Sequence, residues 1–229
     1  MVVSALGAPP PDVVAQLRAR NIVIGALCGK PQHAVKQLAA GVEVIIAQGT
    51  EAGGHTGDIA TMVLVPEVVR ACGPGVAVLA AGGITHGSQV AAALALGAQG
   101  VWCGTLWLGT IESELEPFER EVLFAARAED AVRRRARTGK PVRMLKSKLS
   151  EAWEAPGAPA YLPTPLQGIL YNEAHARVVR AQRADLYSFP VGQSVGSLQR
   201  ETSVKDEMLR LQMEYIDAME RLAALYGGA

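Results

Sequence analysis

The chain has 229 residues, enough for one sizeable hydrophobic core and an appendage. Hydrophobic residues make up 49% and charged residues 19%, as in ordinary globular proteins rather than disordered ones. The 22 basic and 22 acidic residues give a formal net charge of zero, so no global field draws the chain to nucleic acid or to an anionic membrane. A small anionic ligand would then be held by local groups.

Signals for targeting, disulfides and metals are sparse. The three cysteines, Cys28, Cys72 and Cys103, are scattered, which predicts reduced thiols in a cytoplasmic protein. The sequence lacks the pattern of a secretory signal, and no apolar run reaches the length of a membrane span. The histidines do not cluster, so no metal site is predicted.

The first half of the sequence alternates short apolar runs with helix-like segments. Strands are predicted at residues 2–6, 22–27, 42–47, 76–81 and 100–107, and helices at 12–20, 32–40, 61–72 and 88–96. The strands are continuously apolar, which is typical of parallel strands covered on both faces. A strand–helix unit recurs about every 20 to 30 residues, which indicates an α/β fold built from βαβ units.

About five such units precede residue 110, whereas a complete eight-unit barrel needs roughly 250 residues. The pattern fits either a smaller doubly wound sheet or a (β/α) TIM barrel that lacks its first units. The periodicity alone leaves both open.

The second half is predicted to be a mostly helical extension that packs on the first. The predicted domains are therefore residues 1–112, the C-terminal part of a barrel, and residues 113–229. Residues 112–137 are charged and helix-like, and their basic cluster is interpreted as a solvated helix face. That cluster consists of Arg133, Arg134, Arg135 and Arg137.

A last helix is predicted from Ser203, with Asp206 three residues later helping to cap its start. Its apolar residues fall three or four apart and form one stripe, made of Val204, Met208, Leu211, Tyr215, Met219 and Leu222. Such a stripe packs on its own domain or on a partner subunit, so a homodimer is one expectation.

A glycine-rich loop, residues 49–58, directly follows the clearest strand. Ligands of parallel α/β proteins bind beyond the carboxyl ends of the strands, and Gly53 and Gly54 permit close backbone approach there. The loop places His55 at that edge, where an imidazole can exchange a proton near neutral pH. A surface histidine beside turn glycines is the alternative.

Two further turns predict an anion site. Gly82 and Gly83 lie between the fourth strand and an Ala-rich helix, whose free N–H groups and dipole favour an anion. Gly104 and Thr105 lie late in the fifth strand. If the two strands are neighbours, both turns converge on one phosphate, as the loops after the last two strands of barrels often do. A plain turn is the alternative for the Gly-Gly pair.

At these positions the sequence resembles the nitronate monooxygenase family, also called 2-nitropropane dioxygenase-like. The resemblance covers most of the chain and rests on three segments in the same order, residues 47–55, 81–84 and 97–105. Three later segments also resemble the family, residues 112–113, 139–143 and 192–196, of which the last lies near the flavin in relatives.

The resemblance implies an FMN-binding barrel whose N-terminal strands have no counterpart in this sequence. It implies that His55 is the catalytic histidine, acting as a base toward a nitroalkane or assisting oxidation of a nitronate. The other implied site residues contact FMN: Gln48, Gly53 and Gly54 beside the flavin ring, and Ala81, Gly82, Gly83, Gly104 and Thr105 at its phosphate.

The implied reaction is flavin reduction by a nitronate, followed by reaction with dioxygen. A flavin-dependent enoyl-acyl-carrier-protein reductase has a similar Gly-Gly-His loop and is an alternative, with NAD(P)H as the reductant. A second alternative is a non-catalytic truncated paralogue or fragment, because the first barrel strands are expected to be missing.

Overall fold

The structure is a computed structural model that describes residues 1–226, and it divides into two compact units. The first unit comprises residues 1–50, residues 57–103 and the chain from residue 208 onward. The second comprises residues 51–56 and 104–207. The short segment that carries His55 therefore belongs to the second unit, whereas the C-terminal helix returns to the first.

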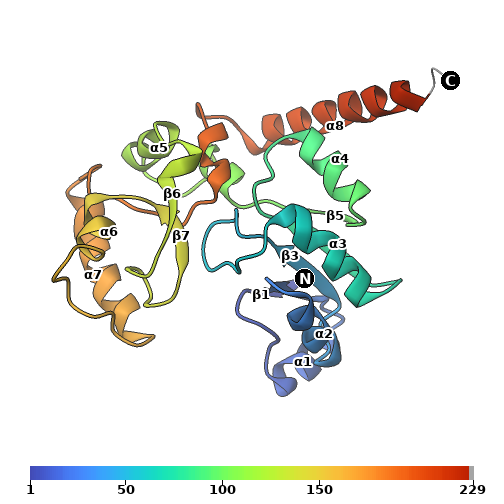
Figure 1. The fold of residues 1–229 in the computed structure, drawn as a ribbon, viewed down its shortest axis with the longest axis horizontal. Helices are drawn as coiled ribbons and strands as arrows, with labels where there is room; N and C mark the ends of the chain where they lie inside the picture. Colours follow the sequence, from blue (N-terminus) through green and yellow to red (C-terminus); the bar gives the residue numbers. More distant parts are fainter. Residues whose placement is uncertain (227–229) are drawn as a thin grey trace. The chain divides into compact units, whose positions relative to one another are not determined.

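The first unit contains a parallel sheet with helices between its strands (Figure 1). The strands are β1 (Val2–Ser4), β2 (Ile24–Cys28), β3 (Val44–Gln48), β4 (Ala77–Ala81) and β5 (Gly100–Trp102). The connecting helices are α1 (Pro11–Arg18), α2 (Pro31–Ala39), α3 (Thr61–Cys72) and α4 (Gly87–Ala95). α1 and α2 both begin at proline, whose missing N–H is harmless in the first turn.

The strand order is β1-β2-β3-β4-β5, without reversal. Every crossover therefore steps in the same direction, and right-handed crossovers place the connecting helices on one face of the sheet. A doubly wound sheet instead reverses its order and carries helices on both faces. The structure thus confirms an α/β fold and selects the partial (β/α) barrel over the doubly wound sheet.

The core of the first unit lies between the strands and their helices. Ile24 in β2 and Ile45 in β3 are fully buried, and α3 contributes Leu64 and Val68 to the same cluster. Burial of each such side chain contributes roughly 1.5–3 kcal/mol. β2 and β3 are buried along most of their length, which explains why their sequences do not alternate between apolar and polar residues.

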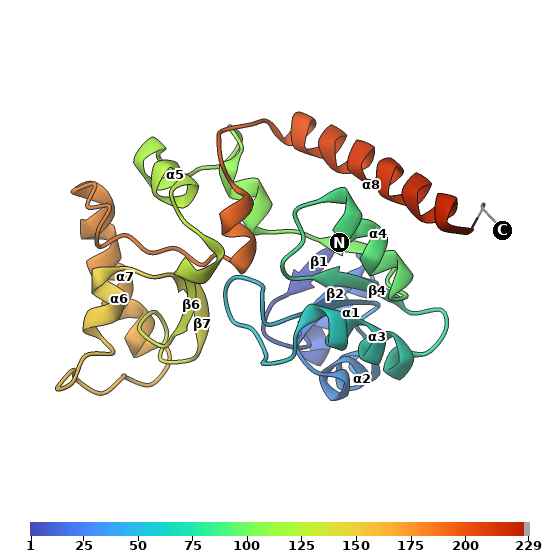
Figure 2. The ribbon, with the colours of Figure 1, turned by 45° about the horizontal axis from the view of Figure 1, so that its top comes forward.

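The second unit combines a strand pair with short helices (Figure 2). Its strands, β6 (Ala131–Arg134) and β7 (Val142–Leu145), are antiparallel. Its helices are α5 (Pro117–Phe124), α6 (Lys148–Ala152) and α7 (Leu166–Arg180), with 3₁₀ turns at Thr105–Gly109, Ala128–Asp130 and Gln193–Ser197. Figures 1 and 2 both show α6 and α7 beside the strand pair.

The prediction of a helix over residues 112–137 is wrong in its second half. α5 ends at Phe124, and Arg133 and Arg134 lie in β6 rather than on a solvated helix face. The hydrogen bonds of the β6–β7 ladder come from a partner strand, so the propensity of the isolated segment does not reveal them. The fifth strand is also shorter than predicted, because the chain enters a 3₁₀ turn at Thr105.

The C-terminal helix α8 (Val204–Tyr226) begins where the sequence predicts. The Asp206 N–H donates to Ser203 Oγ at 3.0 Å, which confirms the predicted cap. Across residues 1–226, no helix combines the length and apolar character that a membrane crossing requires.

The apolar stripe predicted for α8 is only partly buried. Leu211 is buried, but Met208 and Met219 are 44% and 43% exposed. The other buried residue of the described helix is Ala218. α8 lies alongside α4 in both views (Figures 1 and 2), where Gly87 leaves room for the backbone of α8. The α8 backbone therefore lies close to Gly87, and the packing buries only part of the predicted stripe.

Candidate active site

In the first unit, the predicted site residues lie together at the carboxyl edge of the sheet. Gln48 ends β3 and is paired with Ala81, which ends β4. The Gly49 N–H donates to the Ala81 carbonyl oxygen at 2.9 Å. Gly82 and Gly83 follow Ala81 directly, so parallel register brings all of these residues to one place.

The turn formed by Gly82 and Gly83 requires glycine. Their φ values are +113° and +72°, in a region that strains residues with a β-carbon. Thr61 Oγ1 donates to the Gly82 carbonyl at 3.2 Å, and Gln89 Nε2 donates to the Gly83 carbonyl at 2.7 Å. Both carbonyl oxygens are satisfied by side chains, which holds the turn in one conformation.

Gln89 is a residue of this turn that sequence reasoning missed. Its side-chain oxygen accepts the N–H groups of Thr85 at 2.8 Å and His86 at 3.0 Å. A glutamine at the third position of a helix is a known capping signal, so the capping role of Gln89 could have been predicted from the sequence. Thr61 gives no comparable signal, because its contact with the turn depends on the packing of α3 against the sheet.

The N-terminus of α4 is already occupied by a carboxylate. Glu214 Oε2 of α8 accepts the Gly87 N–H at 2.8 Å, and Arg210 donates to Glu214 Oε1 at 2.7 Å. The prediction of free N–H groups at this helix start is therefore wrong for Gly87. The helix dipole is offset by Glu214, so a phosphate at this edge would depend on the preceding glycine turn.

In the second unit, the histidine loop is bound to two segments distant in sequence. Gly54 and Arg143 exchange both backbone hydrogen bonds, at 3.0 Å and 2.7 Å. The Gln193 N–H donates to the Glu51 carbonyl at 2.9 Å. The loop is thus anchored on one side by β7 and on the other by the 3₁₀ turn that begins at Gln193.

Gly53 and Gly192 meet backbone to backbone. A β-carbon on Gly192 would lie 2.6 Å from the Glu51 carbonyl oxygen, and one on Gly53 would lie 2.7 Å from the carbonyl carbon of Val191. The Gly192 N–H donates to Thr105 Oγ1 at 2.9 Å. The structure therefore brings the predicted residues Gly53 and Thr105 together through Gly192, a residue that the sequence indicated only by resemblance.

Replacing Gly192 by alanine should destabilise the protein by about 1–3 kcal/mol, because the new methyl group overlaps a backbone oxygen that cannot move freely. Gly104→Ala is the matched control, since its β-carbon would meet nothing within 4 Å. Denaturant unfolding of both variants measures the difference. Equal free energies of unfolding would contradict the contact.

His55 is solvent-accessible and is held by one side chain. Its Nε2 lies 2.9 Å from Thr138 Oγ1. Desolvation lowers the pKa of the imidazole, and the nearby cations Lys140 and Arg137 lower it further. The ring is therefore neutral at neutral pH, the state in which one nitrogen can accept a proton.

Residues 1–213 match the family model described as nitronate monooxygenase. The chain belongs to this family. The resemblance seen in the sequence is thereby confirmed, and it places the chain in an oxidoreductase family.

Relatives of this nitronate monooxygenase-family chain are longer than the chain itself. A Mycobacterium tuberculosis protein named as a monooxygenase, Rv1533, is 48% identical over 231 residues, which cover 98% of this chain and 61% of that protein. Two solved structures are each 30% identical. One is a nitroalkane oxidase from Streptomyces ansochromogenes, which superposes with a TM-score of 0.83. The match covers 96% of this chain and 65% of the oxidase chain. The other is FabK from Thermotoga maritima, with a TM-score of 0.82. This match covers 97% of this chain and 70% of the FabK chain.

Within the nitronate monooxygenase-family chain, the structure gathers the predicted site residues into two groups. The first unit holds Gln48, Ala81, Gly82 and Gly83, and the second holds Gly53, Gly54, His55, Gly104 and Thr105. In the described residues, no three His, Cys, Asp or Glu side chains are arranged to hold a metal ion.

Proposed function

We propose that this chain carries the FMN-binding and catalytic part of an oxidoreductase that oxidises alkyl nitronates with dioxygen. Family membership supports the reaction class. The observation that carries the proposal is His55, a neutral imidazole with a fixed hydrogen-bond partner, Thr138, on a loop that the backbone holds at both sides. The loop and the two segments that hold its backbone, at Arg143 and Gln193, all resemble the family in sequence.

The glycine turns fit the phosphate of FMN. Gly82 and Gly83 present no side chain to a ligand. A β-carbon added to Gly104 would meet no atom within 4 Å, so there is open space beside it. β4 and β5 pair with Ala81 opposite Trp102, so both strands end at the same level. We propose that Ala81, both glycines of the turn, Gly104 and Thr105 hold the phosphate.

The flavin ring is proposed to lie against Gln48, Gly53 and Gly54. A β-carbon on Gly54 would also meet nothing within 4 Å, which is compatible with a planar group close to the backbone. When bound, the flavin supplies the electron chemistry of the oxidation.

The protein supplies proton control through His55. In one tautomer, the neutral imidazole can take the proton from a nitroalkane carbon, and in the other it can donate its ring N–H to a nitronate oxygen. Thr138 Oγ1 engages Nε2 of the ring, so Nδ1 is the nitrogen proposed to face the substrate. By holding the imidazole in a defined position relative to the substrate, the protein increases the reaction rate beyond that of the cofactor alone.

A flavin-dependent enoyl-acyl-carrier-protein reductase is the second candidate, favoured by the likeness to FabK structures. The two candidates differ in what reduces the flavin. The test is anaerobic: the chain is loaded with FMN and mixed with propyl nitronate, or with NADH or NADPH, while flavin absorbance is followed.

Bleaching by nitronate and not by nicotinamide cofactors is the expected result. The reverse result would favour the reductase. A chain that stays colourless after incubation with FMN would instead support the non-catalytic alternative, and the far-UV circular dichroism spectrum shows whether that chain is folded.

A further inference from the structure

In the first unit, the C-terminal helix α8 packs tightly on the start of α4. A β-carbon on Gly87, the first residue of α4, would overlap the backbone of α8 at Leu211 and Tyr215. Leu211 is itself buried. Two helices approach this closely only where one of them has no side chain, so the contact is tied to this one turn of α4.

Two charged residues of α8 fasten the contact. Glu214 Oε2 accepts the Gly87 N–H at 2.8 Å, and Arg210 Nη2 donates to the Thr85 carbonyl oxygen at 2.9 Å. Arg210 Nη1 also donates to Glu214 Oε1 at 2.7 Å, so the two side chains hold each other. Arg210 and Glu214 are called here the α8 clamp.

The carboxylate of the clamp is charged at neutral pH. Burial raises the pKa of Glu214, but the Gly87 N–H and the Arg210 guanidinium together outweigh that effect and lower the pKa below its ordinary value. The clamp therefore consists of two full charges that neutralise each other while each binds a backbone group of α4 or of the segment before it.

The clamped segment is joined to the glycine turn by Gln89. The Thr85 N–H donates to Gln89 Oε1 at 2.8 Å, and Gln89 Nε2 donates to the Gly83 carbonyl oxygen at 2.7 Å. Thr85 is 2% exposed. Its backbone is thus held from two directions, by Gln89 through the N–H and by Arg210 through the carbonyl oxygen. Loss of the second contact would leave the turn supported by Gln89 alone on this side.

The glycine turn benefits from such support. Gly82 and Gly83 both have positive φ values, and glycine loses more conformational freedom on becoming ordered than any other residue. A ligand that binds a mobile turn has to order it, which weakens the affinity. A turn that is already fixed by its neighbours avoids this loss.

The Glu214 carboxylate has two interpretations. It either occupies an anion site and competes with a phosphate, or it holds the backbone in place for one. The second is favoured because Arg210 neutralises the charge of Glu214 and binds the Thr85 carbonyl oxygen, a contact that a competing anion would not need. The family match ends at residue 213, so family membership does not indicate a role for Glu214.

We propose that Arg210 and Glu214 are positioning residues that hold the glycine turn in the conformation that binds the phosphate of FMN. They act through Thr85, Gly87 and Gln89 rather than by contact with the phosphate. The inference rests on the proposed function in so far as the ligand is FMN.

The first test compares FMN with riboflavin, which differs from it only by the phosphate. The affinity of flavin-free chain for each is measured by fluorescence quenching. Arg210→Gln and Glu214→Gln should each weaken FMN binding about fivefold, less than for a fully buried charged hydrogen bond, because the two side chains are 35% and 32% exposed. Riboflavin binding should stay the same, whereas a merely structural role would weaken both ligands together.

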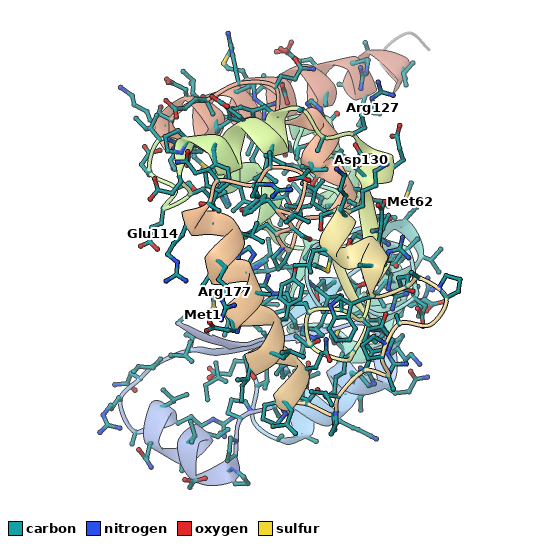
Figure 3. The ribbon with its side chains drawn as sticks, turned by 90° about the vertical axis from the view of Figure 1, so that its left-hand side faces the viewer. Met1, Met62, Glu114, Arg127, Asp130 and Arg177 are labelled. Carbon is teal, nitrogen blue, oxygen red and sulfur yellow. The ribbon has the colours of Figure 1, made fainter. Side chains whose placement is uncertain are left out.

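The matched controls remove the same charges elsewhere on α8. Arg221→Gln and Glu220→Gln alter exposed residues of this helix. Side chains project outward from α8, the red helix at the top of Figure 3. Both controls should keep the affinities of the unaltered chain for FMN and for riboflavin.

The second test needs no flavin. Hydrogen–deuterium exchange of residues 82–89 is followed by mass spectrometry in flavin-free chain. Both clamp variants should exchange about fivefold faster in this segment, because local opening becomes easier, and the controls should not. If the unaltered chain binds FMN no more tightly than riboflavin, the proposed phosphate site is wrong, and the exchange rates still decide whether the clamp holds the turn.

The clamp is refuted if both variants keep the exchange rates of the controls, or if both keep the ratio of FMN to riboflavin affinity. Tighter FMN binding by Glu214→Gln would also overturn it, because the carboxylate would then be a competitor. If the glutamine variants lose their near-UV circular dichroism, Arg210→Lys and Glu214→Asp decide. Both should lower the affinity ratio, and an unchanged ratio in both would refute the clamp.

Discussion

Replacing His55 by alanine should slow nitronate oxidation by roughly 10²- to 10⁴-fold, the usual contribution of a positioned general base. Flavin content should stay the same, because the imidazole contacts Thr138 and is solvent-accessible rather than part of the core. The measurement is kcat/KM with propyl nitronate, together with the flavin-to-protein absorbance ratio. His33→Ala is the control, since His33 is an exposed residue of α2.

The pH dependence gives the same prediction a second readout. The pKa of His55 lies below its ordinary value, so activity should be constant near neutral pH and fall as pH drops through that lowered pKa, where the base becomes protonated. Lys140→Gln removes one of the charges that lower this pKa and should move the acidic limb to higher pH. Turnover of His55→Ala equal to that of the control would remove His55 from the mechanism.

Replacing Gly83 by valine should abolish stoichiometric FMN binding. The residue adopts a φ of +72°, so a branched side chain both strains the backbone by about 1–3 kcal/mol and fills the place proposed for the phosphate. The affinity for FMN should fall by at least about tenfold, as expected when charge-assisted contacts to a phosphate are blocked. Fluorescence quenching of added FMN measures it.

The matched control for this variant is Gly75→Val. Gly75 has a φ of +86° and open space around it, and it precedes β4, whereas Gly83 follows that strand. The control therefore carries the backbone strain without touching the proposed site. If Gly83→Val still holds one FMN per chain, or if both variants lose FMN equally, the phosphate has been placed wrongly.

The strands and helices of the first unit could largely be predicted from the sequence. Their apolar runs are long enough to be recognised from the neighbouring residues alone. α3, for example, begins and ends at the predicted residues, Thr61 and Cys72. The strand order was not readable, because nothing in a single strand specifies its neighbour. Pairing of Gln48 with Ala81 is a property of the assembled sheet.

The second unit was harder to predict because its contacts are distant in sequence and few of its elements are regular. The β6–β7 pair arises from a ladder in which Arg133 faces Arg143, a pairing that side-chain charge would not suggest. The anchoring of His55 by Thr138 joins residues 83 positions apart. Such contacts leave no periodic signal in the sequence.

The residue types at the strand ends can be read from the amino-acid sequence alone, and they indicate both the family and the candidate residues from Gln48 to Thr105. The contacts of each candidate residue appear only once the chain is folded. Packing brings the Glu214 carboxylate to the N-terminus of α4 and the Thr105 hydroxyl to the Gly192 N–H. It also places the Arg137 guanidinium over the Tyr171 ring. A local sequence pattern indicates which residues are buried and where glycine allows unusual backbone angles. Hydrogen-bond partners and neighbouring charges depend instead on how segments distant in sequence pack together.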